Sequence, residues 1–153
     1  MQRLVVVGHG PVAEALAPMA ELLGWTTTVV AAAELPEVEA VVVTSHDVEV
    51  AGAALQEALA RDLAYIGGMG SKKTQTARRE WLLAHGVAES ELDRVHGPAG
   101  LDIGADGPAE IALSILAELT AVLRGRTSVG SIKDRGGPIH PELGPGEAFC
   151  PTG

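Results

Sequence analysis

A short apolar strand that ends in a glycine-rich turn opens this chain. Residues 3–7 read Arg-Leu-Val-Val-Val and run directly into the G-x-G-x-x-A turn of Gly8–Ala13. A helical pattern begins at once from Pro11. In nucleotide-binding α/β domains the first glycine of such a turn allows a tight bend, and the second lets the backbone approach a phosphate. The order of strand, turn and helix therefore predicts an α/β domain with a candidate anion site at Gly8, His9, Gly10 and Pro11. The alternative is a turn that serves packing alone.

The composition favours helices packed on a parallel sheet. Only 3% of the 153 residues are aromatic while 46% are hydrophobic, so the core is expected to consist of aliphatic side chains. The net charge of -9, with no basic face, argues against binding to nucleic acid. No apolar run approaches the roughly 20 residues that span a membrane. The single cysteine, Cys150, excludes an intrachain disulfide. We expect a cytoplasmic protein without nucleic-acid or membrane partners.

Strand and helix patterns alternate along the chain. Strands are predicted at residues 3–7, 26–30, 40–44, 63–67 and around 94–96. Helices are predicted from Pro11 to Gly24 and over residues 48–60, 72–85 and 108–124. Right-handed crossovers between these elements predict a Rossmann-like, doubly wound parallel sheet of three layers in the strand order 3-2-1-4-5. The link of residues 31–39 is short for a parallel crossover, so an abbreviated connection of about one helical turn is expected there.

The character of the sequence changes after Gly125. Residues 126–153 are crowded with glycine and proline and show no hydrophobic periodicity. We therefore divide the chain into a Rossmann-like domain over residues 1–125 and a C-terminal tail over residues 126–153. The tail is expected to be disordered or to lie on a neighbouring subunit.

Polar, glycine-rich segments follow several of the predicted strands. Ligands of open parallel sheets bind beyond the carboxyl ends of the strands. The segments that fall there are Gly8–Pro11, Ser45–Asp47, Gly68–Lys72 and Gly97–Asp102. They add Ser45, His46, Gly70, Ser71, Lys72 and Asp102 to the candidate binding residues.

Two lysines stand where a helix dipole disfavours them. Lys72 and Lys73 lie in the first turn of a predicted helix, where the partial charge is positive. An anion bound at this turn, such as a phosphate, would make both charges favourable. The alternative is that both ammonium groups extend into water.

The end of the second predicted strand lacks the acid of a dinucleotide site. Such folds place Asp or Glu there to hold the ribose hydroxyls, whereas this chain reads Val30-Ala31-Ala32-Ala33. The first acid, Glu34, comes late, so NAD(P) is not favoured as the ligand. The five histidines are spread singly, without the close spacing of a metal site, and no metal is predicted.

Three blocks in the second half of the chain resemble the XdhC/CoxI family. They are Tyr65–Lys72, Gly97–Gly104 and Pro108–Glu118. The glycine turn Gly8–Ala13 and the triplet Ser45-His46-Asp47 fit the same pattern, and the resemblance covers about residues 1–125. The match is to the C-terminal Rossmann domain of that family.

The resemblance implies an accessory protein for a molybdenum hydroxylase of the xanthine dehydrogenase type. Members bind the molybdenum cofactor, help its sulfuration and deliver it to the apoenzyme. For this chain it implies an anionic pterin or nucleotide ligand at Gly8–Pro11, Ser45–His46 and Gly70–Lys72. It also implies the hydroxylase apoenzyme and cofactor-maturation proteins as partners, and we expect a homodimer.

Three features of this sequence depart from the family pattern. Full-length members carry an N-terminal domain with a cysteine-bearing motif, whereas this sequence starts at the Rossmann strand and has its single cysteine at position 150, so independent sulfur chemistry is not expected of this chain. Family members have Asp-x-Arg where this chain has Ala31–Ala33, and arginine where it has Lys72.

Two functions of other classes remain as alternatives. One is a small NAD(P)-dependent oxidoreductase, against which the missing acid argues. The other is a degenerate Rossmann domain that serves only as a protein-interaction scaffold.

Overall fold

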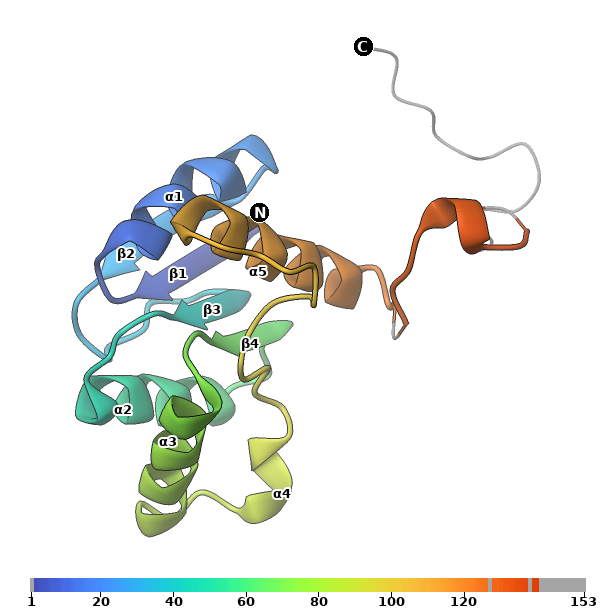
Figure 1. Cartoon of the computed structure of the whole chain (residues 1–153). Coiled ribbons are helices and arrows are strands. Elements are labelled where there is room, and N and C mark those ends of the chain that lie inside the picture. The colour runs from blue at the N-terminus through green and yellow to red at the C-terminus, as the bar shows by residue number, and fades with distance from the viewer. Residues whose placement is uncertain (1, 127, 138, 141–153) are drawn as a thin grey trace.

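The computed structural model describes residues 2–126, 128–137 and 139–140 (Figure 1). Strands and helices alternate through most of this range, as the sequence predicts. In chain order the elements are β1 (Arg3–Val7), α1 (Pro11–Leu22), β2 (Thr26–Val30), β3 (Ala40–Val43), α2 (Val48–Leu59), β4 (Tyr65–Gly68), α3 (Lys72–Ala84), α4 (Glu89–Leu92), α5 (Pro108–Leu123) and the 3₁₀ turn η1 (Ile132–Asp134).

The four strands form one parallel sheet in the order β2-β1-β3-β4. The parallel α/β sheet is confirmed, but the predicted order 3-2-1-4-5 is wrong in two respects. The third strand pairs with β1 instead of β2, and the predicted fifth strand is absent as an element from the described part of the chain. Both differences have a physical origin in the sequence.

The first difference follows from the composition of β2 and β3. Thr26 and Thr28 of β2 are exposed, which suits an edge strand, whereas all four residues of β3 are buried. The all-apolar strand therefore takes the central position beside β1. The link of residues 31–39 carries the chain past β1 without a helical turn, and it is held down by buried Leu35 and Val38.

The second difference arises because only a few residues around His96 are available to form a strand. The short helix α4 ends at Leu92, and Gly97 and Pro98 follow closely. Only His96 pairs with β4, through its amide to the Ile66 carbonyl at 2.9 Å and its carbonyl to the Gly68 amide at 2.9 Å. A single bridge therefore replaces the predicted strand.

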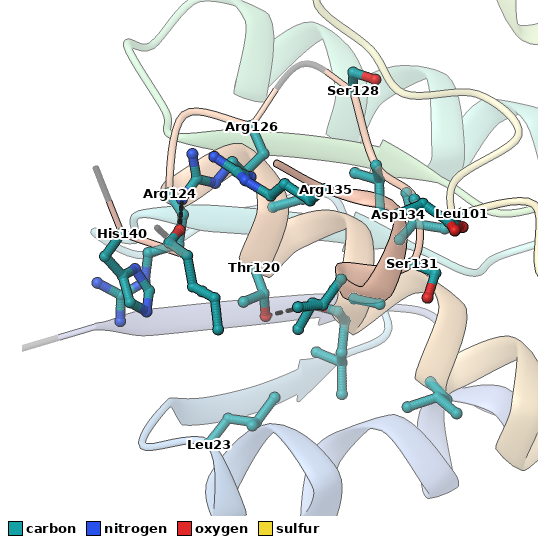
Figure 2. A pocket seen from close by; sticks show the side chains of 18 of the residues that line it. Leu23, Leu101, Thr120, Arg124, Arg126, Ser128, Ser131, Asp134, Arg135 and His140 are labelled. Carbon is teal, nitrogen blue, oxygen red and sulfur yellow. Dashed lines mark hydrogen bonds between the residues drawn. The ribbon is translucent and has the colours of Figure 1, made fainter. Parts of the chain in front are cut away.

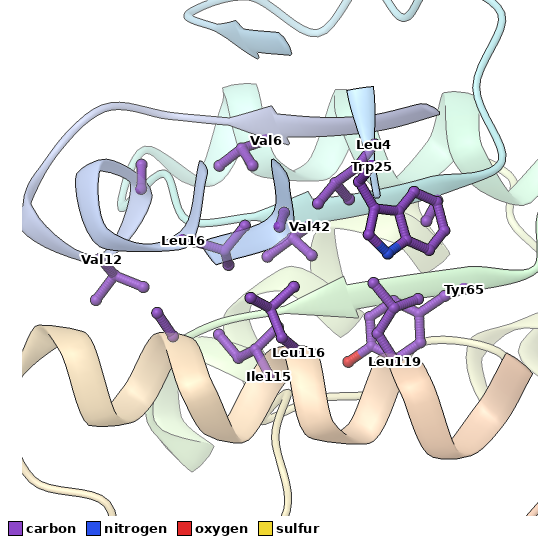
Figure 3. Packing of buried hydrophobic residues seen from close by; sticks show 14 residues of the cluster. Leu4, Val6, Val12, Leu16, Trp25, Val42, Tyr65, Ile115, Leu116 and Leu119 are labelled. Carbon is purple, nitrogen blue, oxygen red and sulfur yellow. The ribbon is translucent and has the colours of Figure 1, made fainter. Parts of the chain in front are cut away.

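Helices cover both faces of the sheet and make the predicted three layers. On one face, α1 and α5 pack over Leu4, Val6 and Val42, and Figure 3 shows α5 side chains directed at α1 and the strands. On the other face, α2 and α3 pack over Val5, Val7 and Val41. The chain thus crosses from one face to the other between β1 and β3. The carboxyl ends of these two strands form the switch point of the sheet.

The segment after α5 runs along the surface. Its described residues 128–137 are all exposed, and η1 is their only helical element. The boundary at residue 125 stays a prediction, and Cys150 lies outside the described residues. Among the described residues, no helix is long and apolar enough to cross a membrane.

One buried hydroxyl in β2 yields a stability prediction. The Oγ1 atom of Thr27 is buried and has no hydrogen-bond partner among the described residues. Thr27→Val keeps the shape and removes this unpaired polar atom, so it should stabilise the fold by about 1 kcal/mol. The measurement is urea unfolding, with Thr28→Val on the exposed face of the same strand as the control. Loss of stability in Thr27→Val would contradict the prediction.

Candidate functional site

Gly8 lets the end of β1 approach the end of β3. Its φ of +120° lies in the region that favours glycine, and a Cβ atom there would stand 2.6 Å from the Ser45 amide nitrogen. The same atom would stand 2.7 Å from Oγ1 of Thr44. The Ser45 and Thr44 amides both donate to the Val7 carbonyl, at 3.1 and 2.8 Å. The two loops of the switch point are therefore in direct contact.

Gly10 opens the N-terminus of α1. It is the N-cap residue at φ +135°, and no side chain caps the helix. A Cβ atom at Gly10 would meet nothing within 4 Å, so the space beside the first turn is open. Pro11 has no amide hydrogen, which leaves the Val12 and Ala13 amides at the positive end of the helix dipole. Such an end is suited to an anion.

The triplet after β3 divides its side chains between helix capping and solvent. Asp47 caps α2, because its Oδ1 accepts from the Glu49 amide at 2.9 Å and from the Val50 amide at 3.4 Å. The Ser45 hydroxyl accepts from the Asp47 amide at 3.2 Å. His46 is exposed, as is His9 in the first turn. Ser45 therefore shapes the loop, and the two imidazoles are accessible to a ligand.

A buried arginine that the sequence analysis missed connects the loops after β3 and β4. Arg78 of α3 is 2% exposed. Its guanidinium donates through NH2 to the Ser45 carbonyl at 2.9 Å and through NH1 to the Met69 carbonyl at 2.6 Å. Burial lowers the pKa of this guanidinium, but arginine remains charged in proteins. The signal was its spacing, because Arg78 stands four residues before buried Leu82 on the inner face of α3.

The second glycine turn is braced from within. Gly70 has φ +135°, and the Ser71 hydroxyl caps α3 by accepting from the Thr74 amide at 3.3 Å. The Gln75 amide group donates to the carbonyls of Gly68 and Gly70 at 3.0 and 3.1 Å. Lys72 is exposed, as predicted. One amide at the N-terminus of α3 is thus already hydrogen-bonded, whereas the N-terminus of α1 has no side-chain cap.

The loop that carries Asp102 is held by a second missed residue, Glu118 of α5. Its Oε1 accepts from the Tyr65 hydroxyl at 2.6 Å and from the Gly100 amide at 3.1 Å. The His96 Nδ1 lies 3.6 Å from the same oxygen, and its ring stacks on Tyr65. Burial and the nearby carboxylate raise the pKa of Tyr65, so its phenol stays a donor. Glu118 escaped the sequence analysis as a site residue because it lies 16 residues beyond Asp102 along the chain.

Hydrogen bonds of the backbone and of the Arg78 side chain join the four predicted segments at the carboxyl ends of the strands. Arg78 connects Ser45 to Met69, and the Ala99 amide donates to the Gly68 carbonyl at 3.0 Å. The side chains of His9, His46, Lys72 and Asp102 are exposed. The described residues contain no group of three or more His, Cys, Asp or Glu that could hold a metal ion. The roles of His9, His46, Lys72 and Asp102 as ligand contacts stay predictions.

The chemistry offered by this edge is anion binding by backbone amides. Its donors are the open amides of α1, with exposed imidazoles and a lysine at its rim. Beyond β2, Ala31 and Ala32 are exposed and carry no carboxylate for a ribose, and Glu34 follows only in the link.

Comparisons with known proteins agree with one another. The family model of the XdhC Rossmann domain matches residues 4–119. The chain is 29% identical over 126 residues to the molybdenum cofactor insertion chaperone PaoD of Escherichia coli (strain K12), covering 78% of this chain and 40% of PaoD. It is 31% identical over 149 residues to the uncharacterized protein YqeB of the same organism, covering 78% of this chain and 27% of YqeB.

A solved structure shares the fold. A crystal structure described as that of a xanthine dehydrogenase from Bacillus halodurans superposes with a TM-score of 0.67 at 26% identity. The match covers 86% of this chain and 45% of that one. The chain therefore spans less than half the length of each of these three relatives.

The carbonyl contacts of Arg78 predict a large cost for its removal. Arg78→Ala leaves the Ser45 and Met69 carbonyls without their donor and should destabilise the fold by about 2–4 kcal/mol. Arg79→Ala is the matched control, because Arg79 forms only an exposed ion pair with Glu89 at 3.0 Å and should change stability by less than about 1 kcal/mol. Guanidinium chloride unfolding of both variants decides, and equal losses would contradict the assigned role.

Proposed function

This chain belongs to the XdhC Rossmann-domain family, and from that premise we propose that it is an accessory protein for a molybdenum hydroxylase of the xanthine dehydrogenase type. Two relatives support this class of function: PaoD, named a molybdenum cofactor insertion chaperone, and the solved structure described as a xanthine dehydrogenase. The activity, cargo and partners of the full-length relatives are carried over to this chain as part of the proposal.

The proposed task of the chain is to bind the molybdenum cofactor, or a nucleotide-like anion, at the switch point. The observation that carries this proposal is the open, uncapped N-terminus of α1 beside the β3 loop. The Val12 and Ala13 amides would bind an anionic group of the ligand, since they lie at the positive end of the helix dipole. The cofactor would be cargo that the protein passes on.

The other candidate residues are assigned to the region between the N-terminus of α1 and the loops after β3 and β4, which we call the crevice. Lys72 supplies positive charge at the start of α3, where an anion would offset the unfavourable dipole. His9, His46 and Asp102 are exposed and would bind the polar edges of a pterin. The Ser45 hydroxyl accepts from the Asp47 amide and the Ser71 hydroxyl caps α3, so their part is to shape the two turns.

The oxidoreductase alternative is not favoured. Ala31–Ala33 after β2 offer no carboxylate to the ribose hydroxyls of NAD. The scaffold alternative has no observation of its own at the crevice, because the open amides of α1 are what a ligand-binding turn requires.

The proposed partners follow from the accessory role. They are the hydroxylase apoenzyme, which would receive the cofactor, and the proteins that complete the cofactor. We also propose a homodimer in the cytoplasm, which native mass spectrometry and cell fractionation would test.

The accessory role predicts that Lys72→Glu weakens cofactor binding. Molybdenum cofactor released from a purified hydroxylase is titrated into the protein, and retained cofactor is counted by molybdenum analysis after gel filtration. Loss of the lysine charge should reduce the binding free energy by about 1–3 kcal/mol, the scale of a charge-assisted hydrogen bond. Folding should change little, because Lys72 is exposed.

Lys133→Glu serves as the control for this titration, because it makes the same charge change at the distant η1. It should bind as the parent does. If the parent retains no cofactor, the proposed function fails. If Lys72→Glu binds like the parent, the function stands but the anion site does not involve this turn.

The absent ribose acid predicts poor binding of NADH. Calorimetric titration should give a dissociation constant in the high micromolar range or weaker. Tight NADH binding would revive the oxidoreductase alternative. ADP and inorganic phosphate titrated in parallel separate recognition of the nucleoside from recognition of its phosphate.

A further inference from the structure

A large groove lies on the outer face of α5, away from the crevice. It is bounded by the last turn of α1, by α5 and by residues of the stretches 128–135 and 139–140, and its volume is about 980 Å³ (Figure 2). α1 contributes its C-terminal residues Met19, Leu22 and Leu23, whereas the crevice lies at its N-terminus. The 12-residue helix separates the two by about 18 Å.

Apolar side chains are concentrated around this groove. The described residues include ten exposed large hydrophobic side chains, and six of them line it: Leu22, Leu23, Leu113, Val129, Ile132 and Ile139. Leu22 is 89% exposed and Ile132 is 65% exposed. A contiguous exposed apolar patch of this kind marks an interaction surface, whereas single apolar residues scattered over a surface do not.

The rim of the groove carries the opposite charge to the rest of the chain. The stretch of residues 124–135 holds four of the 11 Lys and Arg but only one of the 20 Asp and Glu. Arg124, Arg126 and Arg135 line the groove, and they stand on its side away from Leu23 in Figure 2. No acidic side chain of the described residues forms an ion pair with Arg124 or Arg135.

We propose that this groove is a docking site for an acidic amphipathic helix of a partner protein. An amphipathic helix lays its apolar face into a hydrophobic groove, and acidic residues along its flank would meet the arginine rim. Small-molecule pockets enclose most of their ligand, whereas this groove leaves five of its leucines and isoleucines more than half exposed: Leu22, Leu23, Leu113, Ile132 and Ile139. An open apolar surface of this kind fits a helix better than a small molecule.

A second copy of this chain is a poorer occupant. In a symmetric dimer the groove of one copy faces the groove of the other, which brings three arginines per copy together with only one lining carboxylate, Asp134. Like charges placed opposite one another disfavour such a contact. A partner with acidic residues has no such conflict.

The position of the groove allows docking and cofactor binding together. A partner helix on α5 would leave the N-terminus of α1 and the loops around Ser45 and Gly70 uncovered. The inference therefore goes beyond the proposed function and does not depend on which ligand the crevice takes.

The test uses a pair of designed peptides and the full chain. Both peptides are fluorescein-labelled helices of about four turns with leucines at the i, i+3, i+4 and i+7 positions. One carries glutamates on the flanks of the leucine face, and its twin carries lysines there. Fluorescence anisotropy should show the acidic peptide binding at least roughly tenfold more tightly than its twin, with the difference shrinking as salt is added.

Variants of the groove sharpen the test. Leu113→Glu should weaken binding of the acidic peptide by roughly tenfold or more, because it places a carboxylate in the apolar lining. The double variant Arg124→Glu with Arg135→Glu should reverse the preference in favour of the lysine peptide. Leu83→Glu is the matched control, since Leu83 is an exposed leucine of α3 outside the groove and its replacement should leave binding unchanged.

Three outcomes would overturn the proposal. They are equal binding of the two peptides, equal losses in Leu113→Glu and Leu83→Glu, and no binding of the acidic peptide at all. A dimer in sedimentation experiments that Leu113→Glu dissolves would assign the groove to a second copy instead. Circular dichroism of each variant separates lost binding from lost folding.

Discussion

The buried guanidinium of Arg78 is the interaction on which the geometry of the crevice depends. Removing a charge from water costs free energy unless polar groups surround it, and here two backbone carbonyls accept hydrogen bonds from the guanidinium. Those carbonyls belong to Ser45 and Met69, so one side chain of α3 sets the distance between the loops after β3 and β4. Gly68 leaves the necessary room, since a Cβ atom there would lie 3.1 Å from NH1. Replacing Arg78 would remove the donor that the two loops share, and a side chain at Gly68 would press on the guanidinium.

The order of the strands explains why the crevice has the chemistry it has. With β3 beside β1, the helices that follow these two strands lie on opposite faces of the sheet. The uncapped N-terminus of α1 lies at the switch point between them. β2 is left at the edge, and its carboxyl end leads into a link that has no carboxylate near the strand. The uncapped amides of α1 are therefore retained, while the carboxylate that usually contacts a ribose is missing. This combination suits an anionic ligand other than an ordinary dinucleotide.

The sequence predicted what depends on local signals. Pro11 at the first turn of α1, the start of α3 at Lys72 and the glycine turn at Gly8 each depend on a few adjacent residues, and each was found in the structure. The strand order depends on which strand tolerates an edge. The threonines of β2 carried that information, but the usual dinucleotide-fold order outweighed it.

Long-range polar contacts were beyond this kind of analysis. Arg78 donates to a carbonyl and Glu118 accepts from an amide that are distant from them in sequence. A hydrophobic pattern does not indicate such hydrogen-bond partners. Residues 126–140 were interpreted as part of a tail without periodicity. Their isolated apolar side chains gain meaning only where they meet the outer face of α5.

The central claim is that the crevice between β1 and β3 binds the molybdenum cofactor by its anionic end. The most direct measurement is a crystal structure of the protein loaded with cofactor, in which anomalous scattering locates the molybdenum. The account predicts a single molybdenum peak at the carboxyl edge of the sheet, with an anionic group of the ligand on the Val12 and Ala13 amides. A fully occupied peak elsewhere, such as in the groove on α5, would contradict it.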